Sequence, residues 1–260
     1  MKHNLKDTTF VFVVRIDSMT RLENLLLSID ILSSNFDTNI IVVESSYYNN
    51  GILERLMGDN TLYYFIQDKD PIFHRTKYQN YILKQITTNF IGVWEADIIL
   101  DPNLIVEAID ELRKGNCDFA FPYNGKCFDT SSIFRIHYLQ HKSIGFLQKN
   151  TDKMNMLYSS SKEGNAVGGA FLISTEKYRQ AGGENEMFYG WGGEDGERYY
   201  RWLILNYREY RSSGPIFHLS HPRDQNGTIR SKYHEDQMMH EYFKTRNLTK
   251  EELINKIQNL

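Results

Sequence analysis

FVFVV, at residues 10–14, is the first continuous apolar run of the chain and the one on which the fold depends. A run of this kind, rich in β-branched side chains, is typical of a strand that is buried on both faces. Two more such runs follow, at Ile40 to Val43 and at Leu62 to Ile66, and helical patterns separate the three. Strands that alternate with helices predict a parallel sheet with helices packed on its faces. We therefore expect an α/β domain.

The helical segments carry recognisable start and stop signals. Thr20 and Glu23 form a predicted capping box ahead of leucines at helical spacing. Asp101 is predicted to cap a later helix that starts at Pro102 and ends at Gly115, because proline suits the first helical position and glycine the residue after the last turn. Further helices are predicted at 52–57, 75–87 and 175–180.

The second half of the chain has a looser pattern. Residues 128–165 show no clear periodicity, which is typical of a functional loop or an insertion. The sequence leaves open whether this segment is an acceptor-binding loop or a lid. Strands are predicted around it and after it, at 118–122, 168–174 and 216–219.

The last residues form a predicted helix of their own. Thr249 and Glu252 make a second capping box, and apolar residues follow Glu252 at helical spacing. We expect this small amphipathic helix to dock on its own domain. Binding to a partner or to a membrane surface is the alternative.

The composition is that of a globular chain of 260 residues, 41% of them hydrophobic, which is enough for one substantial core. With 30 basic and 33 acidic residues the net charge is -3, so there is no general attraction to nucleic acid. Cys117 and Cys127 are too few for a disulfide framework and are predicted to be free thiols. The run at 10–14 is too short for a signal peptide or a membrane span. We expect a soluble, cytoplasmic protein without a transmembrane segment.

Two carboxylates follow another predicted strand. The apolar run at 90–94 continues directly into Glu95 and Asp97. In open α/β sheets ligands bind beyond the carboxyl ends of the strands, so both acids fall where a site is expected. An acid-x-acid triplet is common by chance, and it is the position that gives this one weight.

A pair of histidines lies at the end of the last predicted strand. His218 and His221 are three residues apart, and on a strand their side chains would point to opposite faces. Both can contact one ion only if the chain turns between them. A carboxylate with imidazoles suits a divalent metal of intermediate hardness, and diphosphate oxygens would complete its coordination. The alternative is that one or both histidines are hydrogen-bonded surface residues.

Charged residues also follow the first strand and open a later helix. Arg15, Asp17 and Arg21 come directly after the strand, and Arg75 and Lys77 begin the helix. Guanidinium groups match phosphate oxygens, so these are suitable places for diphosphate and ribose contacts. Taken singly, each such residue is more often a solvated surface charge.

The stretch FYGWGGEDGERYYRW, residues 188–202, combines glycines, aromatic residues and acids. Its glycines suit a loop folded closely over a ligand. Glu194 and Asp195 begin a predicted helix, at the positive end of its dipole, and one of them could accept a proton from a sugar hydroxyl. Trp191 offers an apolar face and one N–H donor. A simple glycine-rich turn is the alternative.

Together these motifs resemble β-1,4-galactosyltransferase-like enzymes and bacterial glycosyltransferases with a GT-A fold. The similarity spans residues 9–224, and GWGGED with the downstream HPRD is its most specific part. The resemblance implies a Rossmann-like, mostly parallel sheet flanked by helices. The motifs in chain order are VVRIDSMTR, FHRTKYQN, VWEADIIL, VGGAFLI, FYGWGGEDGERYYRW and HLSHPRD.

The resemblance also implies a division of the chain. A GT-A catalytic domain is expected at 1–225, with the nucleotide-binding half at about 1–100 and the acceptor-side half at about 101–225. A small helical extension is expected at 226–260.

Individual residues match functional positions of the family. Asp97 and His221 match metal ligands, and His218 stands where the animal enzymes often carry a metal-binding methionine. Mn²⁺ is the expected metal, with Mg²⁺ as an alternative. Asp195 matches the catalytic base, and Glu194 matches the neighbour that holds the acceptor. Donor-side matches are Glu95, Arg75, Gly169 and Trp191 of the mobile loop.

Two departures from the family pattern bear on the substrates. Gly196 interrupts the three consecutive acids that are common after GWGG, which leaves the acceptor open. Ala166 and Val167 stand where the animal enzymes carry a bulky aromatic residue beside the second carbon of the donor. A donor with an N-acetyl group is therefore compatible with this sequence.

We predict a metal-dependent, inverting glycosyltransferase that moves galactose or N-acetylgalactosamine from a UDP-sugar to a saccharide or lipid-linked saccharide. Its expected role is the synthesis of a bacterial surface polysaccharide, in the cytoplasm or at the inner face of the membrane. Two alternatives stay open, namely a nucleotidyltransferase of related fold and a non-catalytic glycan-binding or scaffold relative. The acceptor, the linkage and the oligomeric state do not follow from the sequence.

Overall fold

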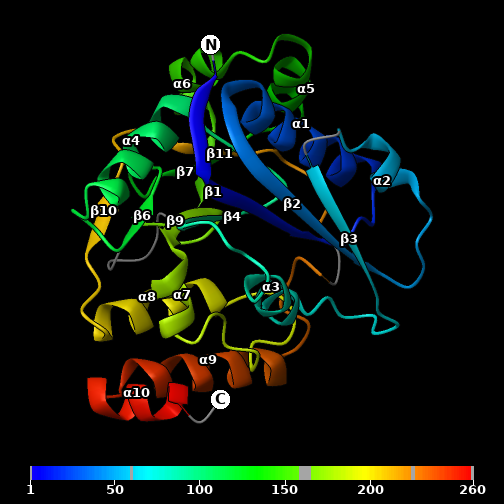
Figure 1. Ribbon diagram of the computed structural model, residues 1–260. Coiled ribbons are helices and arrows are strands. Elements are labelled where there is room, and N and C mark those ends of the chain that lie inside the picture. Colours follow the sequence, from blue (N-terminus) through cyan, green and yellow to red (C-terminus); the bar gives the residue numbers. More distant parts are fainter. Residues whose placement is uncertain (1, 59–60, 158–164, 224–225, 259–260) are drawn as a thin grey trace.

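A mixed sheet with the strand order β10-β6-β9-β4-β1-β2-β3 forms the centre of the computed structural model (Figure 1). The structure describes residues 2–58, 61–157, 165–223 and 226–258. The strands of this sheet are β1 (His3–Val14), β2 (Phe36–Ser46), β3 (Thr61–Gln67), β4 (Phe90–Trp94), β6 (Phe119–Phe121), β9 (Ala170–Ser174) and β10 (Glu209–Arg211).

β1 is an interior strand, and it pairs in parallel with both β2 and β4. β3 continues the parallel half, whereas β9 runs antiparallel to β4 and β6. Phe10, Val11 and Phe12 are completely buried, because helices cover the two faces to which they point. The expected α/β fold with a mostly parallel sheet is confirmed.

Helices cover the sheet on both faces (Figure 1). On one face lie α1 (Met19–Asn35) and α4 (Pro102–Arg113), and on the other lie α3 (Arg75–Leu83), α7 (Thr175–Gln180) and α8 (Glu194–Ile204). Phe171 of β9 anchors α7 and α8, since its ring contacts those of Tyr178 and Trp202 with centroids 5.7 and 5.2 Å away. The short α2 (Ile52–Leu56) lies next to β3.

The predicted helix signals hold for α4 but not for α1. Asp101 caps α4 by accepting from the amide of Asn103, and Pro102 is its first residue, as predicted. The capping box predicted at Thr20 and Glu23 is wrong. Ser18 has the extended backbone of a cap, and its hydroxyl accepts from the amide of Arg21, so α1 begins at Met19.

A second, smaller sheet has the order β5-β11-β7-β8. Its strands are β5 (Ile98–Ile99), β11 (Ile216–His218), β7 (Cys127–Asp129) and β8 (Asn155–Leu157). Two of them belong to the segment without clear periodicity, which also holds α5 (Ser132–His141), α6 (Ile144–Lys149) and the 3₁₀ turn Thr151–Lys153. These elements are too short to produce a readable period.

The segment that carries α5 rests on α1. Arg135 of α5 is buried, and its Nε donates to Oδ1 of Asn24 at 2.8 Å. Its Nη2 forms an ion pair of 2.6 Å with Glu23. Asn24 in turn donates to the carbonyl oxygen of Leu219. These contacts fasten α5 to α1; residues 158–164 of the same segment lie outside the described residues.

Two further helices, α9 (Lys232–Arg246) and α10 (Lys250–Gln258), lie below α8 in Figure 1. Leu253 of α10 is buried in the main core, and Thr249 and Glu252 form the expected capping box. The helix therefore docks on its own chain, as predicted. Residues 224 and 225, beside the predicted domain boundary, lie outside the described residues.

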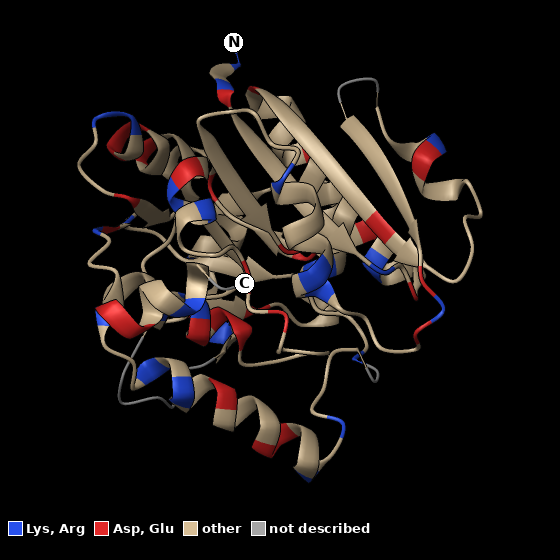
Figure 2. Cartoon of the chain, turned by 60° about the horizontal axis from the view of Figure 1, so that its bottom comes forward, with Lys and Arg blue, Asp and Glu red and all other residues tan. Residues whose placement is uncertain are grey.

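Charges of both signs are interspersed along the helices (Figure 2). On α9, for example, Lys232 pairs with Glu235 at 3.1 Å. Cys117 and Cys127 are buried free thiols, as expected. Within the described residues no helix is long and apolar enough to cross a membrane.

Candidate active site

A cavity of about 390 Å³ opens where the carboxyl ends of β1 and β4 meet the loop before α8. This is the edge of a parallel sheet at which ligands bind, and the volume is that of a small-molecule site. Residues from distant parts of the chain line it, namely Cys127, Leu157 and members of 13–21, 73–79, 94–98, 165–169, 190–196, 216–223 and 226–227.

Asp97, His218 and His221 meet on one side of the cavity. Oδ2 of Asp97 lies 2.8 Å from Nε2 of His221 and 3.6 Å from Nε2 of His218. β11 ends at His218 and the chain turns before His221. Both imidazoles can therefore face one ion, which two residues three apart on a continuous strand could not do. The amide of Leu219, between them, donates to the carbonyl oxygen of Asp97 at 2.7 Å and fixes the turn.

These three side chains have the chemistry of a divalent metal site. Their potential ligand atoms lie within 4.8 Å of one another. Oδ1 of Asp97 is buried and has no hydrogen-bond partner among the described residues, as expected of an oxygen that binds an ion. One carboxylate with two imidazoles is a donor set for transition-metal ions such as Mn²⁺.

Asp97 and His218 shift each other's pKa. Burial alone would raise the pKa of Asp97, but the two imidazoles hold it well below its usual range. Burial would likewise lower the pKa of His218, but the charge of Asp97 and the hydrogen bond to Asp129 raise it to about 10. Without a metal, the carboxylate therefore faces a protonated His218.

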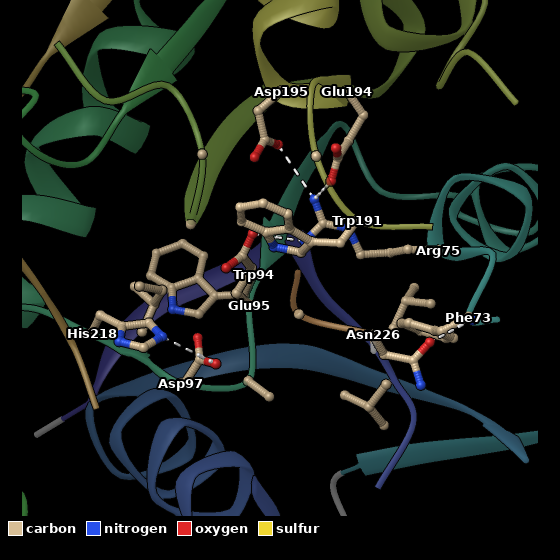
Figure 3. A pocket seen from close by; sticks show the side chains of 18 of the residues that line it. Phe73, Arg75, Trp94, Glu95, Asp97, Trp191, Glu194, Asp195, His218 and Asn226 are labelled. Atoms are coloured by element: carbon tan, nitrogen blue, oxygen red, sulfur yellow. Dashed lines mark hydrogen bonds and ion pairs between the residues drawn. The ribbon is translucent and has the colours of Figure 1, made fainter. Parts of the chain in front are cut away.

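Arg75 joins three carboxylates across the cavity (Figure 3). Its Nη1 donates to Glu95 at 2.7 Å, and its Nη2 to Glu194 at 2.6 Å and to Asp195 at 3.4 Å. Burial raises the pKa of Glu194 to about 7, although the charge of Arg75 acts in the opposite direction. Glu194 therefore changes its protonation state near neutral pH.

Asp195 is held by a second arginine. Nη2 of Arg198, one turn along α8, donates to Oδ1 of Asp195 at 2.5 Å. Arg198 is itself buried, and its Nη1 contacts both carboxylate oxygens of Glu184 at 3.1 and 3.0 Å. The hydrogen bonds therefore engage Oδ1 of Asp195, while Oδ2 faces Gly168, where a Cβ atom would lie only 2.4 Å away.

Trp191 lies in a glycine loop beside these acids. Gly190, Gly192 and Gly193 all have positive φ, of 96, 109 and 84°, which glycine adopts without strain. The loop packs against α9, since a Cβ atom on Gly192 would lie 3.5 Å from Met238. Nη2 of Arg230 donates to the carbonyl oxygen of Tyr189 at 2.7 Å.

The predicted donor-side residues differ in what they contact. Nε of Arg15 donates to the carbonyl oxygen of Ser45, and its Nη1 to those of Asp70 and Pro71, so this side chain holds loops together. Arg21 forms an ion pair with Asp17 at 3.0 Å.

Lys77 is exposed and does not line the cavity. Residues two positions apart on a helix are about 200° apart around its axis, so Arg75 and Lys77 cannot face the same site. Every other candidate site residue from the sequence lines the cavity: Arg15, Asp17, Arg21, Arg75, Glu95, Asp97, Gly169, Trp191, Glu194, Asp195, His218 and His221.

Several cavity or neighbouring residues were not predicted. Arg223, within the HPRD motif, lies with its guanidinium carbon 5.8 Å from the Trp191 ring centre. Oδ1 of Asn226 accepts from the amide of Phe73 at 2.9 Å. Arg198 and Asp129 contact predicted site residues. Arg198 follows Asp195 at helical spacing, which was a readable signal, whereas nothing in the sequence links Asp129 to His218.

Known glycosyltransferases resemble this chain in part of its sequence and in its fold. Residues 145–224 match a family model described as the N-terminal domain of galactosyltransferase. No curated protein matches the chain. A solved structure of a Drosophila β1,4-galactosyltransferase 7 mutant, in complex with manganese, UDP-galactose and xylobiose, is similar with a TM-score of 0.54 and 15% identity. The match covers 88% of this chain and 79% of that one.

A second similar structure is the mannosyltransferase of Pyrobaculum calidifontis in complex with GDP-mannose and Mn²⁺. Its TM-score is 0.56 at 11% identity, and the match covers 92% of this chain and 63% of that one. At such identities the likeness concerns the fold. The chain has the fold of these GT-A enzymes, as predicted.

Proposed function

We propose that this chain, a galactosyltransferase-like glycosyltransferase of the GT-A type, transfers a hexose from a UDP-sugar to a saccharide acceptor with inversion at the anomeric carbon. One observation carries the proposal. A single cavity holds a metal-type group, Asp97 with two histidines, and a pair of adjacent acids, Glu194 and Asp195, that can handle a hydroxyl proton.

Asp97, His218 and His221 would hold the divalent ion. Mn²⁺ is the proposed ion, since the Drosophila and Pyrobaculum structures contain manganese, and Mg²⁺ is the alternative. When bound, the ion supplies Lewis-acid charge that stabilises the departing diphosphate. The buried, unpaired Oδ1 of Asp97 supports this assignment.

Asp195 is the proposed general base. Oδ2 would take the proton of the acceptor hydroxyl while the hydroxyl oxygen bonds to the anomeric carbon and the bond from that carbon to the UDP oxygen breaks. The contacts of Oδ1 with Arg198 and Arg75 would keep the carboxylate in one orientation during this step. Glu194 would bind another hydroxyl of the acceptor.

Donor binding is assigned to a group of residues that includes Arg75, which also contacts Glu194 and Asp195. Arg75 and Glu95 form an ion pair of 2.7 Å, and Asp17, which follows β1, pairs with Arg21 in the first turn of α1. Closure of the loop that carries Trp191 would exclude water, which otherwise hydrolyses the donor. Ala166 and Val167 are compatible with galactose or N-acetylgalactosamine.

The proposed setting is the synthesis of a bacterial surface polysaccharide in the cytoplasm or at the inner face of the membrane. The acceptor would be a saccharide or a lipid-linked saccharide. A nucleotidyltransferase would need a second cluster of metal-binding carboxylates, and among the described residues Asp97, His218 and His221 form the one such group.

The test is the release of UDP from a panel of UDP-sugars, with Mn²⁺, Mg²⁺ or EDTA. We expect release from UDP-galactose or UDP-N-acetylgalactosamine that requires the metal. Asp195→Asn should retain binding of that donor and lose transfer by about 10²–10⁴-fold. Failure to bind any UDP-sugar would contradict the proposal, and it would favour the scaffold alternative.

A further inference from the structure

Asp129, the last residue of β7, contacts a predicted metal ligand from outside the cavity. Its Oδ1 lies 2.7 Å from Nδ1 of His218. Nε2 of the same ring lies 3.6 Å from Oδ2 of Asp97. The two ring nitrogens of His218 therefore face two different carboxylates, one within the metal-type group and one behind it.

The backbone fixes this arrangement. β7 and β11 pair in parallel with Asp129 opposite His218, so the two side chains lie next to each other. The amide of Thr130 donates to the carbonyl oxygen of His218 at 2.9 Å, and the amide of Ser220 donates to Oγ1 of Thr130 at 3.0 Å. The His218 side chain is also 9% exposed, which leaves its ring little freedom.

His221 is held in a related way. Its Nδ1 lies 2.8 Å from the carbonyl oxygen of Pro222, which can only accept, so Nδ1 carries the hydrogen. Nε2 of His221 then faces Asp97 with its lone pair when the ring is neutral. A carboxylate on Nδ1 of His218 selects the same tautomer for the second ring.

We propose that Asp129 is a positioning residue that orients His218 and selects the tautomer needed for metal binding; this inference rests on the proposed metal site. Nδ1 of His218 donates its hydrogen to Asp129, and Nε2 keeps its lone pair for the ion. A carboxylate behind a ligating imidazole raises its basicity, and loss of such a partner usually weakens metal binding by about 10–100-fold.

The experiment measures Mn²⁺ affinity from the electron paramagnetic resonance signal of the free ion, at a fixed concentration of UDP. Asp129→Ala is expected to bind Mn²⁺ about 10–100-fold more weakly than the unmodified protein. Asp129→Asn keeps an acceptor oxygen, so its Mn²⁺ affinity should fall less than that of Asp129→Ala. Asp152→Ala removes a carboxylate from an exposed turn of the same segment and should bind normally. Circular dichroism checks that each variant is folded.

The same substitution in a His218→Ala background separates positioning from other roles. If Asp129 acts through His218, Asp129→Ala has no further effect on Mn²⁺ affinity in that background. An equal loss in both backgrounds, or no loss in the single variant, would overturn the inference. If Asp97→Asn binds Mn²⁺ as tightly as the unmodified protein, the metal site itself is wrong and the inference falls with it.

Discussion

Arg198 and Asp195 lie three residues apart on α8, and Nη2 of the arginine is 2.5 Å from Oδ1 of the aspartate. The arginine side chain is 2% exposed, and its other amino group is bound to Glu184, which is fully buried. The hydroxyl of Tyr178 also donates to Glu184. The proposed base is therefore the outer end of a buried chain of charges and hydrogen bonds.

The first prediction concerns this chain. Arg198→Gln should lower the free energy of unfolding by about 3–5 kcal/mol, because it leaves the charge of Glu184 buried without its partner. It should also reduce kcat, since Asp195 loses one of the two contacts that orient its carboxylate. Urea unfolding measures the first effect. The double variant with Glu184→Gln should recover part of the stability, and no recovery would contradict the ion-pair explanation.

Gly168 provides a test of Asp195 that leaves its charge in place. A Cβ atom at Gly168 would lie 2.4 Å from Oδ2 of Asp195, so Gly168→Ala should displace the carboxylate. We expect kcat to fall at least tenfold while UDP affinity in Mn²⁺ stays the same. Gly145→Ala, where the added atom meets open space, is the matched control. Normal turnover in Gly168→Ala would argue against Oδ2 as the proton acceptor.

Glu194 should make the protein less stable as the pH rises. Burial raises its pKa to about 7 from 4.5, so between these values the folded state binds more protons than the unfolded state. Its contribution to stability is fully present below pH 4.5 and is lost towards pH 7.

At pH 8, Glu194→Gln should therefore unfold at a higher temperature than the unmodified protein, with a free energy of unfolding larger by roughly 1–3 kcal/mol. At pH 4.5 the two proteins should have nearly the same stability. The same variant should lose transfer activity. Glu251→Gln, on the exposed surface of α10, should show neither change. A stability difference that is equal at both pH values would contradict the assigned pKa.

Metal binding should depend steeply on pH. The pKa of His218 is raised to about 10 in the absence of an ion, chiefly because the charge of Asp97 outweighs the effect of burial. A metal requires the neutral imidazole, so binding must release this proton. The logarithm of the Mn²⁺ association constant should rise by about one per pH unit between pH 6.5 and 8.5 under inert gas. A plateau above pH 7 would show that His218 is already neutral there.

The sequence allowed the prediction of those parts of the molecule that depend on local pattern. The apolar runs of β1, β2 and β4 correctly predicted buried strands. The prediction is wrong for β3, because β3 lies at the edge of the sheet and Leu62 is 59% exposed. Glu95 and Asp97 could be placed at the ligand-binding edge because they follow one of these runs. The hydroxyl of Ser18, on the other hand, competes with that of Thr20 to cap α1, and local pattern does not decide between them.

Contacts between distant segments could not be predicted in this way. The pairing of Asp129 with His218 depends on the register of β7 and β11, across 89 residues of sequence. Arg15 lies after β1 as a phosphate-binding arginine would, but carbonyl groups 30 and 55 residues further along accept its hydrogen bonds. The positions of α5 and α6 depend on contacts with α1, such as those of Arg135 with Asn24 and Glu23. Their own hydrophobic periodicity is too weak to predict these positions.

Gly196, which interrupts the acidic run common in the family, lies where α8 packs against α9. A Cβ atom there would lie 3.0 Å from the ring of Tyr242 on α9, so the glycine allows α9 to pack closely on α8. Glu197, the acid that follows, is buried and accepts from Thr245 at 3.0 Å and from Arg201 at 3.1 Å. Its carboxylate therefore joins α8 to α9, a role that sequence alone did not suggest.

The most direct test of the central claim is the affinity for UDP measured by calorimetry, with Mn²⁺ and with EDTA, in the unmodified protein and in Asp97→Asn. We expect Mn²⁺ to strengthen UDP binding at least tenfold in the unmodified protein and to have no effect in Asp97→Asn. UDP binding that is the same with Mn²⁺ and with EDTA in the unmodified protein, or equally strengthened by Mn²⁺ in both proteins, would contradict the account.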